Sequence, residues 1–146
     1  MDSVGFLEGL LRIPSPSGSE AAVAAHLVEE MARLGFRSHI DAAGNAAGAA
    51  GDPAAQKTIV LLGHMDTVPG MVPVRREGEL LYGRGAVDAK GPLAAFVLAA
   101  ARAAPQMENT QLVVVGAVEE ESHGLGARYL AEHLPAPDYA IIGEPS

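Results

Sequence analysis

The chain has 146 residues, of which 49% are apolar and only 4% aromatic, so a single domain with an aliphatic core is expected. Eighteen acidic against ten basic residues give a net charge of −8, which argues against nucleic acid or an anionic membrane surface as partner. The absence of cysteine excludes disulfides and thiolate metal sites.

Two helices are expected first along the chain. Residues 3–13 carry leucines at helical spacing, and the stretch PSPSGSE then interrupts the pattern. A second helix is predicted over residues 19–34, with Ser17 or Ser19 as its capping residue. The first residues lack the basic start of a signal peptide and no segment reaches the length of a membrane span, so a soluble, cytoplasmic protein is predicted.

The middle of the chain predicts strands. Residues 36–40 form a short strand, and the Gly- and Ala-rich residues 41–56 are predicted to be a loop or weak hairpin with little reason to pack tightly. The apolar run at 57–64 is typical of a central strand that is buried on both faces. Residues 74–85 alternate around a glycine-containing turn, which predicts a small hairpin.

The remaining elements alternate between helix and strand. Helices are predicted over 91–104, with Pro92 in the first turn and Pro105 beyond the end, and over 124–134. Buried strands are predicted over 110–120 and 137–146. Buried strands that alternate with helices predict an α/β layered fold with a largely parallel sheet and helices on both faces.

Histidine or acidic residues follow each buried strand, and one more acid precedes a predicted helix. The set comprises His64, Asp66, Asp88, Glu119, Glu120 and Glu144. In open α/β sheets, ligands bind beyond the carboxyl ends of the strands, so these side chains can converge although they are far apart in sequence. One imidazole with several carboxylates is a ligand set that suits zinc, cobalt or manganese.

Each of these residues has a simpler explanation. A single acid at a strand end is usually a solvated loop residue, and EEESHG on its own would more often be a turn. The Gly-rich GRGAVDAKG could suggest a phosphate-binding loop, but it lacks the spacing of a P-loop or a dinucleotide fingerprint. The coincidence of all the acids at one predicted rim is what the simpler explanations do not account for.

Four motifs occur in a fixed order along nearly the whole chain: GHMDTVPG, LYGRGAVDAKGPLAAF, VGAVEEESHGLGARYL and DYAIIGEPS. Together they resemble the dinuclear-zinc M20 peptidase and deacylase family. The combination of GHMDTVPG with GEPS is most similar to the acetyl-lysine/acetylornithine deacetylase branch. That branch includes the hydrolase that frees lysine or ornithine from an amino-group carrier protein.

The resemblance implies a role for four metal ligands. His64 and Glu144 would bind one zinc, Glu120 would bind the second, and the carboxylate of Asp88 would bridge the two. A complete active site would hold two Zn²⁺ ions, with Co²⁺ as an alternative. The resemblance also implies a cis peptide bond between Asp88 and Ala89.

Two further residues would act without binding metal. Asp66 would accept the other ring N–H of His64 and fix its tautomer, which is a common task for a carboxylate behind a metal ligand. Glu119 would be the general base that takes a proton from the attacking water and delivers it to the leaving amine.

The implied activity is metal-dependent hydrolysis of an amide. The substrate would be an N-acyl amino acid or an amino-group carrier conjugate, and the full-length protein would be a homodimer. Family members continue into a lid and dimerisation domain and supply a late histidine, so residues 1–146 would be the N-terminal part of the catalytic domain and inactive alone. The alternative is a non-catalytic truncated paralogue that acts as a metal- or partner-binding module.

Overall fold

A five-stranded sheet with the order β1-β2-β6-β3-β7 forms the centre of the structure, a computed structural model that describes residues 2–145. Its strands are β1 (Arg37–Ile40), β2 (Ala46–Gly51), β3 (Lys57–His64), β6 (Thr110–Ala117) and β7 (Tyr139–Ile142). β3 pairs in parallel with β6 and β7, whereas β2 is antiparallel to both β1 and β6. All strands except β2 therefore point in the same direction, which confirms the largely parallel sheet.

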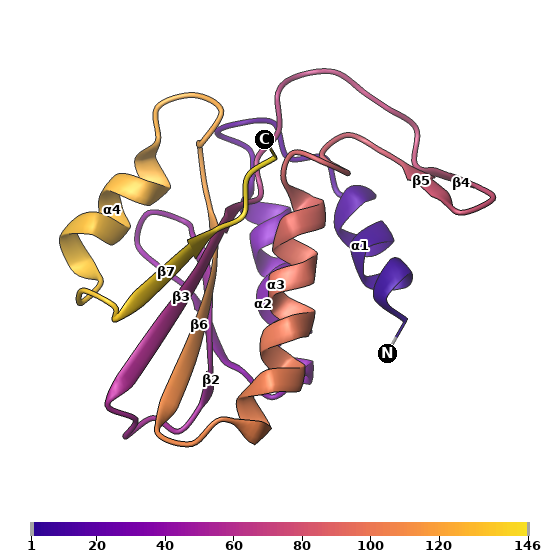
Figure 1. Cartoon of the computed structure of the whole chain (residues 1–146). Coiled ribbons are helices and arrows are strands. Elements are labelled where there is room, and N and C mark those ends of the chain that lie inside the picture. Colours follow the sequence, from indigo (N-terminus) through magenta and orange to yellow (C-terminus); the bar gives the residue numbers. More distant parts are fainter. Residues whose placement is uncertain (1, 146) are drawn as a thin grey trace.

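Helices lie on both sides of this sheet (Figure 1). α1 (Ser3–Leu11), α2 (Ala21–Arg33) and α3 (Lys90–Ala103) lie on one side, and α4 (Leu125–His133) lies on the other. A 3₁₀ turn, η1 (Ala104–Gln106), follows α3, and β4 (Arg75–Glu77) and β5 (Leu80–Tyr82) form the predicted hairpin apart from the main sheet. Among residues 2–145, no helix has the length and hydropathy that crossing a bilayer requires.

Glycines at the ends of the two central strands let α3 approach the sheet closely. A Cβ on Gly63 would lie 3.4 Å from Leu93 Cβ, and one on Gly116 would lie 3.1 Å from Leu93 Cδ2. Leu93 is fully buried in the first turn of α3. Because glycine has no side chain at these positions, the start of α3 and the loop that carries Asp88 can pack against the carboxyl ends of β3 and β6.

The Gly- and Ala-rich segment departs from its prediction. The structure places β2 inside the sheet between β1 and β6, and Ala46 is fully buried. β2 pairs antiparallel with β1, which lies before residues 41–56, so the segment forms one strand of a hairpin rather than a loop or a hairpin of its own, and the expected loose packing was wrong. The reason is steric: a Cβ on Gly48 would lie 2.6 Å from Met31 Sδ and 3.2 Å from Phe36 Cδ1, so the absent side chain makes room for α2 and the residues after it.

The last strand lies within the predicted residues, but its predicted burial was wrong. Residues 137–146 were expected to contain a buried strand, yet all four residues of β7 are exposed. β7 is at the edge of the sheet and pairs only with β3 among the described strands. An apolar composition sets the preference for burial but does not show which neighbours cover a strand.

Candidate metal centre

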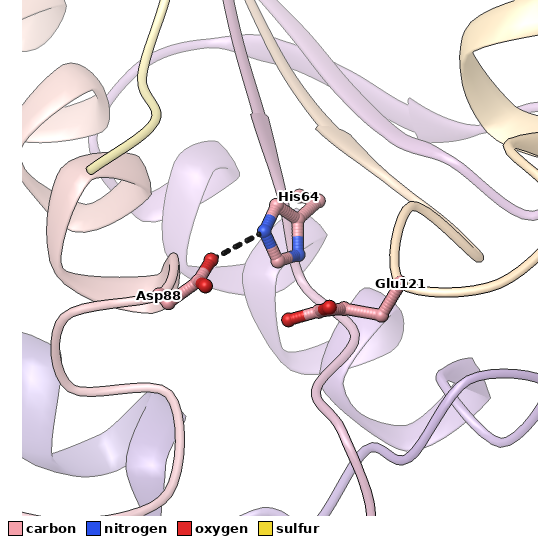
Figure 2. A group of neighbouring side chains, drawn as sticks. All are labelled: His64, Asp88 and Glu121. Atoms are coloured by element: carbon pink, nitrogen blue, oxygen red, sulfur yellow. Dashed lines mark hydrogen bonds and ion pairs between the residues drawn. The ribbon is translucent and has the colours of Figure 1, made fainter. Parts of the chain in front are cut away.

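The imidazole of His64 is the centre of the acidic rim. It ends β3 and is 1% exposed, and its Nε2 lies 3.0 Å from Asp88 Oδ1. Figure 2 marks this contact with a dashed line. The same nitrogen lies 3.6 Å from Glu144 Oε2 and 3.8 Å from Glu120 Oε2. The four residues that were predicted as metal ligands are thus gathered around one ring nitrogen, and the Asp88–Ala89 peptide bond is cis, as the resemblance implied.

Asp66 holds the other ring nitrogen. His64 Nδ1 lies 3.0 Å from the backbone oxygen of Asp66 and 3.2 Å from its Oδ1. Both oxygens can only accept, so Nδ1 carries the proton that it donates to them. In the neutral ring Nε2 is then left with a free lone pair that points at Asp88 and the other acids.

Asp66 is also fully buried and is surrounded by donors. Besides His64, its carboxylate accepts from Ser17 Oγ at 2.6 Å and from the backbone N–H groups of Glu120 and Glu121 at 3.0 Å each. Burial would raise the pKa of Asp66, but the hydrogen bonds from His64, Ser17 and the two amides outweigh it and lower the pKa to about 2. The residue is therefore a buried anion with every neighbour arranged to stabilise its charge.

Glu119 stands apart from this group. Its carboxylate is 3.5 Å from Nδ1 of His123, and within residues 2–145 it forms no ion-pair contact with His64. Its backbone has a φ of 55°, a left-handed conformation that costs a non-glycine residue roughly 1–2 kcal/mol. Strained backbone of this kind persists only where surrounding contacts impose it, and it clusters at functional sites.

Glu121 is a rim residue that the sequence analysis did not select. One donor atom each from His64, Asp88 and Glu121 lie within 4.8 Å of one another, and Figure 2 shows the two acids on either side of the ring. Burial and the nearby Asp88 carboxylate raise the pKa of Glu121. The run of three glutamates was visible in the sequence, but it did not indicate that the third would turn inward.

The charges at the rim fit a bound divalent cation. Burial, together with the Glu120 and Asp88 carboxylates, raises the pKa of Glu144 against the opposing effect of His64. Burial would lower the pKa of His64, but Asp66 and Asp88 outweigh it and raise the pKa to about 9. When a cation replaces the proton on Nε2 of His64, this nitrogen and the surrounding carboxylates would form the O/N donor set that zinc and similar ions accept.

The segment before α2 was interpreted incorrectly. Ser17 or Ser19 was predicted to cap this helix, but its N-cap is Glu20, whose side chain makes no capping hydrogen bond. Ser17 instead donates to Asp66, and the Glu20 carboxylate accepts from the backbone N–H of Glu119 at 3.0 Å. A serine can satisfy its hydroxyl at a distant partner as well as at a local one, and the sequence does not distinguish the two.

The raised pKa of His64 predicts a pH dependence of stability in the metal-free protein. Because the folded pKa is about 9 and the ordinary value is 6.5, the stabilisation is fully present below pH 6.5 and is lost as the pH rises through about 9. The difference in unfolding free energy between the parent and His64→Gln, measured by urea unfolding with EDTA, should shrink over this range. Burial lowers the pKa of Lys90 to about 8, but its contribution is common to both proteins and cancels. A constant difference from pH 6.5 to 9 would contradict the prediction.

The fold and the donor cluster together define a class: α/β domains that carry an imidazole and carboxylates at the carboxyl rim of their sheet. Residues 60–146 match the model of Peptidase family M20/M25/M40, which is more than half of the chain. The chain belongs to this family.

Two curated relatives carry more specific names. The chain is 50% identical over 137 residues to the [LysW]-lysine hydrolase of Deinococcus radiodurans, covering 92% of this chain and 37% of the relative. It is 47% identical over 88 residues to the [LysW]-lysine/[LysW]-ornithine hydrolase of Sulfurisphaera tokodaii, covering 60% of this chain and 25% of the relative. The chain thus spans well under half the length of these relatives.

The fold is also similar to that of solved structures. A metallo-carboxypeptidase of the M20 family from Sulfolobus solfataricus superimposes with a TM-score of 0.81 at 24% identity. The match covers 100% of this chain and 38% of that protein. At this identity the likeness concerns the fold alone.

Proposed function

We propose that this chain is the N-terminal part of the catalytic domain of a metal-dependent amide hydrolase that releases lysine or ornithine from a carrier-protein conjugate. The observation that carries the proposal is the gathering of Asp88, Glu120 and Glu144 around Nε2 of His64. Family membership supports the hydrolase, and the names of the two curated relatives support the substrate class. A homodimer, which the resemblance implies, and a cytoplasmic location, which the sequence favours, stay predictions.

His64, Asp88, Glu120 and Glu144 would hold two zinc ions, or cobalt in their place. Bound there, the ions would supply the positive charge that polarises an amide carbonyl and makes water more acidic. Asp66 would keep the proton of His64 on Nδ1, so that Nε2 stays available as a ligand. Proton and cation compete for that nitrogen, so metal binding should weaken as the pH falls.

Glu119 would be the general base of the reaction. Its carboxylate is 24% exposed and lies outside the group around His64, which leaves it free to accept the proton of the attacking water. The same carboxyl group would then protonate the leaving amine, so that the products are a carboxylate and a free amino acid.

The test is an assay of the complete protein with added zinc or cobalt. Lysine and ornithine joined by an amide to a carrier protein would be offered beside N-acetylornithine, and release of the free amino acid would be measured. We expect the carrier conjugates to be hydrolysed and EDTA to stop the reaction. Metal binding without hydrolysis of any of the three substrates would instead support a non-catalytic metal- or partner-binding module.

A further inference from the structure

We infer that Glu20 is a positioning residue that holds Glu119 in its working orientation. The inference rests on the proposed function, because it assigns Glu20 a role through the residue proposed as general base. Glu20 is 5% exposed although it carries a carboxylate, and it lies 99 positions from Glu119 in sequence. A buried carboxylate needs hydrogen bonds, and the hydrogen-bond partners of Glu20 indicate its role.

Four successive backbone amides after β6 are held by side-chain oxygens from other parts of the chain. The N–H of Val118 donates to Asn45 Oδ1 at 3.0 Å, and the N–H of Glu119 donates to Glu20 Oε1 at 3.0 Å. The next two amides both donate to the carboxylate of Asp66. All three acceptor residues are buried, so side chains from distant parts of the chain help to fix the path of this loop.

The bond from Glu20 acts at the strained position. Glu119 has the left-handed φ of 55°, and its backbone oxygen accepts from the N–H of Gly124 at 2.7 Å. The peptide groups on both sides of its Cα are thereby held, and together they set the direction in which the side chain leaves the backbone. Without the acceptor, Glu119 would be free to relax toward an ordinary backbone conformation and turn its carboxylate elsewhere.

The alternative is that Glu20 only stabilises the loop before α2. Its Oε1 also accepts from the backbone N–H of Gly18 at 3.0 Å, so this contact has to be separated from the one to Glu119. Both amides share that oxygen, so no change at Glu20 separates the two contacts, and the separation comes from measurements that report on Glu119 itself. Two variants of similar size test the role of the oxygen. Glu20→Met fills the buried space but removes the acceptor, whereas Glu20→Gln retains an oxygen that can accept from both amides.

The first measurement is amide hydrogen exchange in the metal-free chain, followed by NMR. In Glu20→Met the Glu119 amide should exchange on the order of tenfold faster, because it loses a hydrogen bond to a charged group. The amides of Glu120 and Glu121, which Asp66 holds, should keep their protection. Unchanged exchange at Glu119, or equal loss at all three amides, would overturn the inference.

The second measurement is the kinetics of the complete protein with its best substrate. Glu20→Met should lower kcat by about 10²-fold, as small misplacements of catalytic groups do, with KM and metal content unchanged. Glu20→Gln should recover most of the loss, and Glu29→Ala, at a 66% exposed side chain on the same helix, should behave as the parent. Unchanged kcat in Glu20→Met, or a fall in metal content that explains the loss, would refute the positioning role. An inactive parent would refute the proposed function, whereas hydrogen exchange would still decide whether Glu20 holds Glu119.

Discussion

Glu119→Gln should leave both metal ions bound and remove nearly all turnover in the complete protein. The amide retains the shape of the side chain and its hydrogen-bonding reach, but it cannot accept a proton. General-base assistance raises a reaction rate by about 10²–10⁴-fold, so kcat should fall by a factor in this range or larger. Steady-state hydrolysis and metal analysis of the same preparations provide the measurement.

Glu120→Gln is the matched control, because the two neighbours have identical side chains. Glu120 Oε2 lies 3.8 Å from Nε2 of His64, whereas the carboxylate of Glu119 contacts His123. Glu120→Gln should therefore lose metal first, and excess zinc should restore part of the activity. If Glu119→Gln strips the metal and Glu120→Gln retains it, the two roles are reversed.

Asp66→Asn should destabilise the fold by about 3–5 kcal/mol, the usual cost of removing one partner from a buried charged pair. The donors around the carboxylate are His64 Nδ1, the Ser17 hydroxyl and the amides of Glu120 and Glu121. An asparagine side chain presents an NH₂ group in place of one oxygen, so a donor would face donors. Urea unfolding at neutral pH, with EDTA present, measures the change.

Asp52→Asn is the corresponding control. Asp52 is exposed, and its Oδ1 accepts from the N–H of Ala54 at 2.8 Å, which an asparagine oxygen can do equally well. The change in unfolding free energy should stay within about 0.5 kcal/mol, as at most surface positions. A loss below about 1 kcal/mol for Asp66→Asn would show that the buried carboxylate is not needed for the fold.

The sequence predicts elements whose signal is local. The apolar runs that became β3 and β6, and the helical pattern with Pro92 in its first turn, are readable within a few residues. β2 is not readable in this way, because Ala and Gly are poor strand formers and its burial depends on Met31 and Phe36 filling the space beside Gly48. For the predicted strand over 137–146, the local signal gave the strand but not its burial, because its apolar residues form β7 and remain exposed.

The candidate site also contains residues that a local motif identifies and residues that only long-range contacts reveal. His64, Asp88, Glu120 and Glu144 were identified because each stands at a strand end or in a recognisable motif, and the structure gathers them at one rim. Glu20, Ser17 and Glu121 were missed because their importance lies in contacts. A contact between residues 49 or 99 positions apart leaves no periodic trace in a single sequence.

The hydrogen bonds that distant residues make to the loop after β6 affect how fast this loop can become ordered during folding. Its amides are bound by residues that lie 54 to 99 positions earlier in the chain, so each bond requires a large loop to close first. Contacts of such range form slowly compared with helices and local turns. A chain that has already collapsed around its aliphatic core would still lack the ordered acidic rim until the regions around Glu20, Asn45 and Asp66 have all docked. We therefore expect the acidic rim to become ordered later than the helices and local turns, which form from contacts close in sequence.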